Sequence, residues 1–284
     1  MVIPRAAIRR YAEKLSQLTS KADEAVRVRV EAYMAENPAA TVEELRNFTI
    51  VTIDEVVSSY GDAASVAATS LYDEIMSAEG VITDAAKLYA GPNKDAIERG
   101  VRYQARWLKE DERNPERYVN EVRELTRYHV RKAANDTTID NVERTNAQFI
   151  ARQRRQRRAI STGRLGRAGK VRYGRIPTGL ETCTFCTMLA SRGFVYSSAE
   201  SAGHADHRGC NCLIIPGIQG HTEVDGYDPE ILRHLWQDFL EIDGKAIHGE
   251  EGEILTGVAE ERAIQAMKAE ALRARLGRDT FDAE

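Results

Sequence analysis

Apolar runs long enough to cross a membrane are missing from this chain of 284 residues. A membrane-spanning helix requires about 20 consecutive apolar residues, and no segment approaches that length. The first ten residues contain basic side chains but neither an apolar core segment nor a small-residue cleavage site, so we expect no secretory signal. These absences argue against a membrane partner and predict synthesis in a cytosol.

Cysteine is scarce, and its four copies all lie between residues 183 and 212. In a reducing cytosol, clustered cysteines bind metal or stay reduced more often than they form disulfides. Aromatic residues make up only 7% of the chain, whereas Ala, Glu and Arg are frequent, a composition that favours helix. The hydrophobic content of 42% is enough for a core. We therefore predict a mainly α fold.

Residues 1–150 are predicted to form a helical N-terminal region. Apolar side chains recur at intervals of three and four along residues 4–36, and Asn37-Pro38 should end this helix. Thr41 and Glu44 have the spacing of a capping box that begins the next helix.

Glycine and proline predict the later boundaries of this region. We expect Gly61 to break the second helix, which resumes over residues 62–78. Gly91-Pro92-Asn93 should cap a helix that runs through Leu108, and Pro115 fits the first position of the next. A further helix is expected from about Thr138.

Residues 151–175 are strongly basic and contain no acidic residue. Ten of the 40 basic residues of the chain lie here, which leaves 30 against 44 acidic residues elsewhere. Four glycines in the second half predict a linker after a basic helix end. The candidate docking residues are Arg152, Arg154, Arg155, Arg157, Arg158, Arg164, Arg167, Lys170, Arg172 and Arg175. They could neutralise phosphates, dock onto an acidic protein surface, or form a solvated face.

Residues 176–222 contain every cysteine and are predicted to form a small α+β module with a helix over 183–191 and strands over 193–196 and 212–215. Thiolate and imidazole ligands suit zinc, and a Cys-x-x-Cys pair with a second ligand pair about 20 residues later is typical of a structural zinc site. The candidate ligands are Cys183, Cys186, His207, Cys210 and Cys212, with His204 the weakest. The spacing does not choose four among them.

Other interpretations of the cysteines remain open. They could be reduced and buried as small apolar residues, or form two disulfides after release from the cell. A catalytic zinc would use His221, either in a deaminase, whose His-x-Glu pattern it resembles although the order of motifs is reversed, or in a zinc-dependent nuclease or hydrolase, for which no supporting acidic pair is evident. Residues 223–284 are predicted to form acidic C-terminal helices, one that begins at Asp228-Pro229-Glu230 and runs through Leu240 and one over 253–276. Trp107 and Trp236 are expected to lie in the core or a helix interface.

The segment from Arg175 to Tyr196, followed by the segment from His207 to Pro216, resembles the phage minor head proteins related to the F protein of phage Mu, in the form found in actinobacterial tailed phages and prophages. Members open this motif with Cys-x-x-Cys and a Met-Leu-Ala-Ser-Arg-Gly helix exit and close it with His-x-x-Cys-x-Cys. Arg208-Gly209 departs from the family pattern and leaves the ligand set open.

The resemblance implies a structural, non-enzymatic role in head morphogenesis. Such a protein would enter the capsid in few copies, at the capsid interior or the portal vertex, after assembly in the host cytoplasm. Its expected partners are the portal protein, the major capsid protein, or both, with the arginine segment also placed for packaged DNA. Its zinc would be structural, and no residue would be catalytic.

Overall fold

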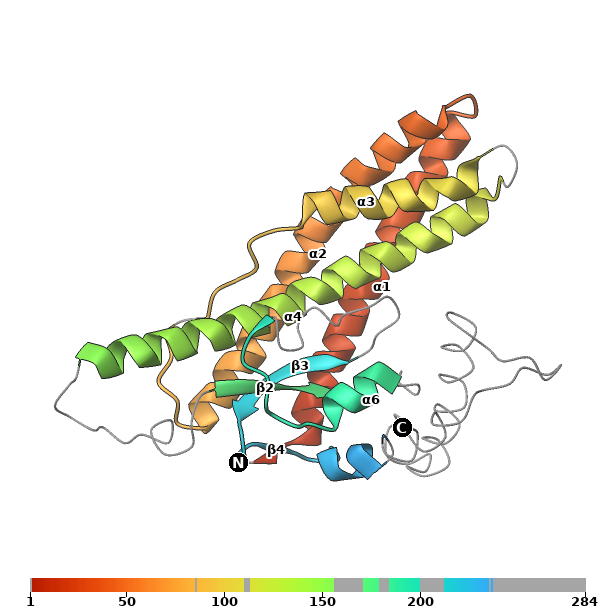
Figure 1. Ribbon diagram of the computed structural model, residues 1–284. Helices are drawn as coiled ribbons and strands as arrows, with labels where there is room; N and C mark the ends of the chain where they lie inside the picture. The colour runs from red at the N-terminus through yellow and green to blue at the C-terminus, as the bar shows by residue number, and fades with distance from the viewer. Residues whose placement is uncertain are drawn as a thin grey trace.

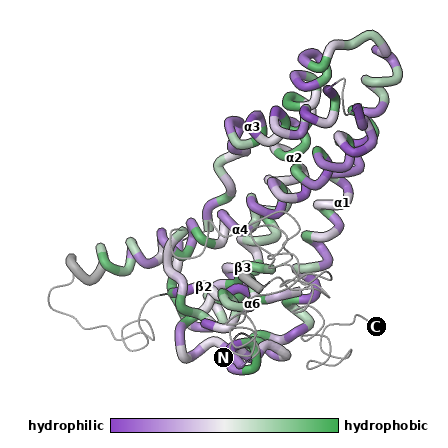
Figure 2. The backbone as a smooth tube through the Cα atoms, turned by 45° about the vertical axis from the view of Figure 1, so that its right-hand side comes forward, coloured by the Kyte–Doolittle hydropathy of each residue, from purple (hydrophilic) through white to green (hydrophobic). Residues whose placement is uncertain are grey.

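The computed structural model describes residues 2–84, 86–109, 113–155, 171–178, 184–199, 212–234 and 236. Its largest part is a bundle of three long helices, α1 (Arg5–Glu36), α2 (Val42–Ala78) and α4 (Pro115–Arg155), with the shorter α3 (Lys94–Gln104) beside them (Figure 1). Hydrophilic and hydrophobic residues alternate along these helices (Figure 2), as amphipathic packing requires. The predicted mainly helical N-terminal region is confirmed.

The turn between α1 and α2 forms as its residues predict. The Asn37 backbone and side-chain N–H groups both donate to the Tyr33 carbonyl, which ends α1. The Thr41 hydroxyl accepts from the Glu44 N–H while the Glu44 carboxylate accepts from the Thr41 N–H, so the capping box is complete. This reciprocal bonding satisfies two backbone donors that the helix start would otherwise leave unpaired.

The predicted break at Gly61 is wrong, because α2 continues through it. A Cβ built on Gly61 would lie 3.3 Å from the Cβ of Ala133 on α4, so the missing side chain lets the two helices approach closely. Glycine costs only about 1 kcal/mol inside a helix, which such packing offsets.

The two helices expected around Thr138 are one uninterrupted helix, α4. The Thr137 hydroxyl donates to the Ala133 carbonyl at 2.7 Å within the same helix. Its oxygen also lies 2.9 Å from the hydroxyl oxygen of Ser65 on α2. Thr137 therefore connects two helices and does not mark the start of a new one.

A short helical turn, η1 (Ala105–Leu108), follows α3, as expected for a helix running through Leu108. Trp107 is only partly buried against the core. The guanidinium carbon of Arg117 lies 3.5 Å from the centroid of its ring. Trp107 therefore contacts both the apolar core and a cationic side chain at the surface.

Two small sheets follow the helices. Strand β2 (Val171–Ile176) pairs antiparallel with β3 (Leu213–Ile218), with Tyr173 opposite Pro216. The backbone N–H and carbonyl of Tyr173 bond Tyr196 on the other edge, so Pro216 removes no bond from this pairing. Residues 171–175 were expected to belong to the linker; their place in β2 corrects that expectation.

The first residues of the chain join this C-terminal part. Strand β1 (Val2–Ile3) pairs in parallel with β4 (Glu223–Val224). The Asn146 amide of α4 donates to the Val171 carbonyl at 2.9 Å, which ties the β2–β3 sheet to the bundle. The predicted strand over 193–196 is reduced to the single bridge at Tyr196, whereas the one over 212–215 lies within β3.

A further helix begins at Pro229 and is described over residues 229–234 and at 236, with Asp228 accepting bonds from the Glu230 and Ile231 N–H groups at its start. This is the start predicted from Asp228-Pro229. The rest of the range predicted for this helix, and the helix predicted over 253–276, lie outside the described residues.

Candidate functional site

Two of the five favoured zinc ligands lie together in the structure. Cys186 is on the short helix α6 (Thr184–Ala190), and Cys212 directly precedes β3. Their exposed fractions are 1% and 3%, and they form a small buried cluster separate from the main core. Thus two sulfur atoms from segments 26 positions apart are brought to one place. Cys183, His207 and Cys210, and the weaker candidate His204, lie outside the described residues.

Two tyrosines fix the helix that positions Cys186. The Tyr196 hydroxyl donates to the Leu189 carbonyl at 2.7 Å, and the Tyr227 hydroxyl donates to the Ala190 carbonyl. Burial raises the pKa of Tyr196 to about 12 and that of Tyr227 further still. Through these two bonds the hydroxyls hold the end of α6 in place, and the raised pKa values keep both of them protonated into alkaline pH.

Among the parts of the chain that the structure describes, no group of three or more His, Cys, Asp or Glu residues is placed to hold a metal ion. The donor chemistry at the cysteine pair nevertheless fits zinc, because two thiols meet in a buried setting. Cys183 immediately precedes α6 and Cys210 lies two residues before Cys212, so further candidates adjoin the pair in sequence. His221 is exposed in the turn after β3.

The arginine segment is only partly described. Arg152, Arg154 and Arg155 lie in the last residues of α4, whereas Arg157, Arg158, Arg164, Arg167 and Lys170 fall outside the described residues.

Strand β2 places the other two arginines. Arg172 is partly exposed, and Arg175 is fully buried with an exposed fraction of 0%. The predicted docking role of Arg175 is therefore wrong, since a buried side chain cannot reach phosphates or a partner's surface.

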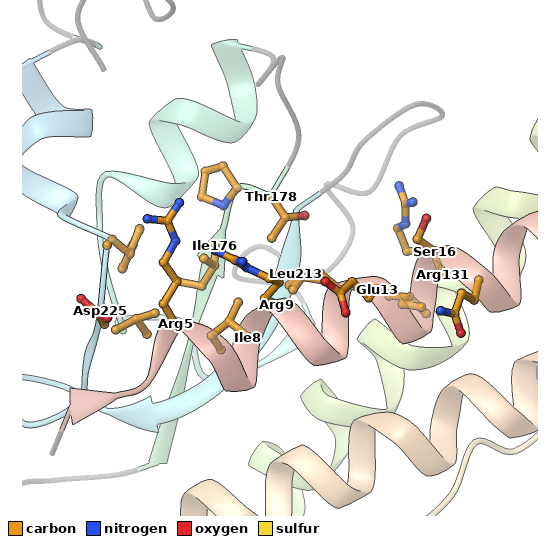
Figure 3. Close-up of a pocket in the computed structure, with 17 residues that line it drawn as sticks. Arg5, Ile8, Arg9, Glu13, Ser16, Arg131, Ile176, Thr178, Leu213 and Asp225 are labelled. Carbon is orange, nitrogen blue, oxygen red and sulfur yellow. The ribbon is translucent and has the colours of Figure 1, made fainter. Parts of the chain in front are cut away.

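Sequence reasoning missed a cavity of about 500 Å³ between α1 and the β-structure. Figure 3 shows Arg5 and Arg9 projecting from one side of α1 toward Ile176 and Thr178. No spacing along the sequence predicts this cavity, because residues from five separated segments form its wall. It is lined by Arg5, Ile8, Arg9, Ala12, Glu13, Leu15, Ser16, Gln17, Arg131, Ile176, Pro177, Thr178, Leu213, Val224, Asp225, Gly226 and Tyr227.

The cavity has an apolar floor and a charged rim. Ile8, Leu15 and Leu213 are buried beneath it, and Arg9 and Glu13 are exposed at its edge. Arg131 contributes a third cationic side chain from α4.

Gly226 fixes the wall next to Arg5. Its φ of +74° suits glycine, and an added Cβ would lie 3.3 Å from Arg5 Cδ. The absent side chain is what lets Arg5 pack against this loop, so the loop and the helix together set the position of one cationic group.

No described helix is long and apolar enough to cross a membrane. No solved structure matches the chain. The chain is similar to the Gene 15 protein of Mycobacterium phage D29, with 30% identity over 23% of this chain and 35% of the relative. It thus spans about a third of the length of that curated relative.

A protein-family model described as VG15 protein matches residues 3–239. The matched region includes α1, α2, α3 and α4, the β2–β3 sheet, strand β4 and the cysteine pair. Together with the similarity to a phage protein, this match shows that the chain belongs to the VG15 protein family and is phage-associated.

Proposed function

We propose that this protein is a minor structural component of a tailed-phage head that binds the portal protein, the major capsid protein, or both. The observation that carries the proposal is the family match over residues 3–239 together with similarity to a mycobacteriophage protein. The resemblance of the cysteine motif to Mu F-like head proteins supplies the finer role. In this role the protein acts by noncovalent binding and not as an enzyme.

The architecture supports a building-block role. The three long helices form an arm, and β1 pairing with β4 connects its first residues to the C-terminal sheet region. Val28 on α1 and Val51 and Val66 on α2 are each at least half exposed. Apolar side chains on the outside of a rigid helical arm are suited to helix packing against another subunit.

We propose that zinc braces the module that carries α6. Cys186 and Cys212 would supply two thiolates, with the remaining ligands coming from Cys183, His207 and Cys210. When bound by four protein ligands, zinc stabilises a small fold and leaves no open position for catalysis. The buried pairing of the two described cysteines supports this assignment.

Quantitative mass spectrometry of purified proheads and mature particles tests the proposal. We expect the protein in heads at far fewer copies than the major capsid protein, and we expect a phage with a stop codon in this gene to assemble fewer filled heads. Absence of the protein from both particle types would remove the proposed role. Contact between packaged DNA and Arg152–Arg172 stays a prediction.

A further inference from the structure

We propose that the cavity between α1 and the β-structure binds an acidic, apolar-anchored peptide segment of a partner protein in the phage head. An apolar side chain of the segment would enter the cavity, and its carboxylates would meet Arg9 and Arg131 at the rim. This inference rests on the proposed function, since it names the chemistry by which the head partner is held.

The size and floor of the cavity fit a peptide side chain. A volume of about 500 Å³ lies within the range of roughly 300–1,000 Å³ that ligand pockets occupy. Ile8, Leu15 and Leu213 form apolar walls that are already buried from solvent. Inserting an apolar side chain there removes its surface from water, which favours binding.

The charges at the start of α1 favour an anionic partner. The first turn of α1 contains no acidic residue, and no side chain caps its N-terminus at Pro4. Arg5 is the first residue of α1, and Arg9 and Arg10 follow in its second turn. Cations near a helix N-terminus oppose the helix dipole, whereas anions stabilise it. Carboxylates of a bound segment would therefore offset an unfavourable local arrangement.

The same lining argues against nucleic acid as the occupant. Glu13 and Asp225 are exposed and also line the cavity, and they would repel a continuous row of phosphates. An apolar floor also offers nothing to a phosphate backbone. A peptide, in contrast, can place an apolar side chain in the cavity and direct its backbone N–H groups toward Glu13.

Site-specific photocrosslinking in phage-infected cells tests the proposal with the full-length chain. A photoreactive amino acid replaces Ser16, which is exposed and lines the cavity. The matched control replaces Lys14, which is exposed on the same helix but does not line it. We expect the Ser16 probe, and not the Lys14 probe, to crosslink to an acidic segment of the portal or major capsid protein, identified by mass spectrometry.

Charge reversal provides a second measurement. Arg9→Glu should lower the number of copies per head by about tenfold or more, because a charge pair at the partner is lost. Arg10→Glu, one residue away and outside the cavity, should leave incorporation unchanged. Equal melting temperatures of both variants and the parent would show that folding is intact.

The outcomes separate this inference from the proposed function. Absence of the protein from heads would contradict the proposed function itself. Presence in heads with no Ser16 crosslink, or with crosslinks only to DNA or to other residues of its own chain such as 237–284, sinks the peptide site alone. Normal incorporation of Arg9→Glu also overturns it.

Discussion

The hydroxyl of Thr222 donates a hydrogen bond to the carboxylate of Glu79 across 2.5 Å, although the two residues are 143 positions apart. Glu79 caps the C-terminal end of α2, and Thr222 lies in the turn between β3 and β4. Both side chains are buried. The same hydroxyl accepts a bond from the Ile218 N–H at 2.7 Å, so one atom connects the helical arm to the sheet turn.

Replacing this hydroxyl should loosen the junction between arm and sheet. We expect Thr222→Val to lower the free energy of unfolding by about 1–3 kcal/mol, because a buried carboxylate and a backbone N–H each lose a partner. Thr222→Ser keeps the hydroxyl and should cost much less. Urea unfolding of both variants makes the comparison, and equal stabilities would show that the bond contributes little.

A buried carboxylate should hold α1 to α4. Asp23 has an exposed side-chain fraction of only 2% and lies 2.6 Å from Arg127 and 3.1 Å from Arg123. Asp23→Asn leaves two cations facing a neutral group, and we expect a loss of roughly 2 kcal/mol, moderated by the partial exposure of both arginines. Glu24→Gln, next to it on the surface, removes the exposed pair with Arg27 and should change stability much less, because solvent screens exposed charges. A similar effect of the two substitutions on thermal unfolding would contradict the assignment.

Gly217 leaves no room for a larger side chain, because the ring of Phe194 packs directly against it. A Cβ there would lie 2.6 Å from the Phe194 ring and 2.9 Å from Thr222 Cβ. We expect Gly217→Ala to destabilise the protein by about 1–3 kcal/mol through overpacking. A Cβ on Gly174 would lie 3.3 Å from the Phe194 ring, so Gly174→Ala should lower the free energy of unfolding by less than Gly217→Ala. If Phe194→Leu fails to recover part of the loss at Gly217, the ring is not the cause.

The sequence predicted those boundaries that depend on local bonding. Thr41 with Glu44, and Asn93 before α3, use side chains to satisfy nearby backbone groups, so a few residues contain the whole signal. Gly61 misled the prediction because its role is set by Ala133, far along the chain. A local pattern cannot report such a partner.

Strand β2 and the cavity were missed for a related reason. Arg172, Gly174 and Arg175 give β2 the composition of a polar linker, and only tertiary packing buries Arg175. The proximity of Cys186 and Cys212 could be predicted from the sequence, because cysteines with the spacing of a metal site are expected to lie close together. The arginines that line the cavity follow no recognisable spacing in the sequence, because Arg5 and Arg9 lie on α1 and Arg131 lies on α4.

Alkaline pH should unfold the protein cooperatively. Burial raises the pKa of Tyr72, Tyr118 and Tyr196 to about 12, above the value of about 10 for an unfolded chain. Because the folded pKa is the higher one, the stability that these groups contribute is complete below about pH 10 and is lost as pH rises toward 12. Urea unfolding from pH 8 to 12, followed with tyrosinate absorbance, measures the loss.

The control for that experiment removes one titrating group. Tyr72→Phe should give a shallower decline of stability above about pH 10, although it also loses the bonds to Thr145 and to the Asn141 carbonyl. Stability that stays level across this range would contradict the role of the buried hydroxyls.

Metal analysis should find about one zinc per purified chain. A chelator should then lower the melting temperature, and Cys186→Ser should remove the metal and the chelator effect together. His221→Ala is the matched control, since that histidine is exposed in the turn after β3 and should leave zinc in place. A metal-free chain whose melting is unchanged in Cys186→Ser would end the zinc assignment.

The parallel pairing of Val2 and Ile3 with Glu223 and Val224 has a consequence for synthesis on the ribosome. The arm can form while translation proceeds, but the first residues must wait for a strand made more than 200 positions later. Contacts of such long sequence separation form late. A chain terminated before residue 223 would therefore carry a helical arm whose peptide-binding wall is never completed.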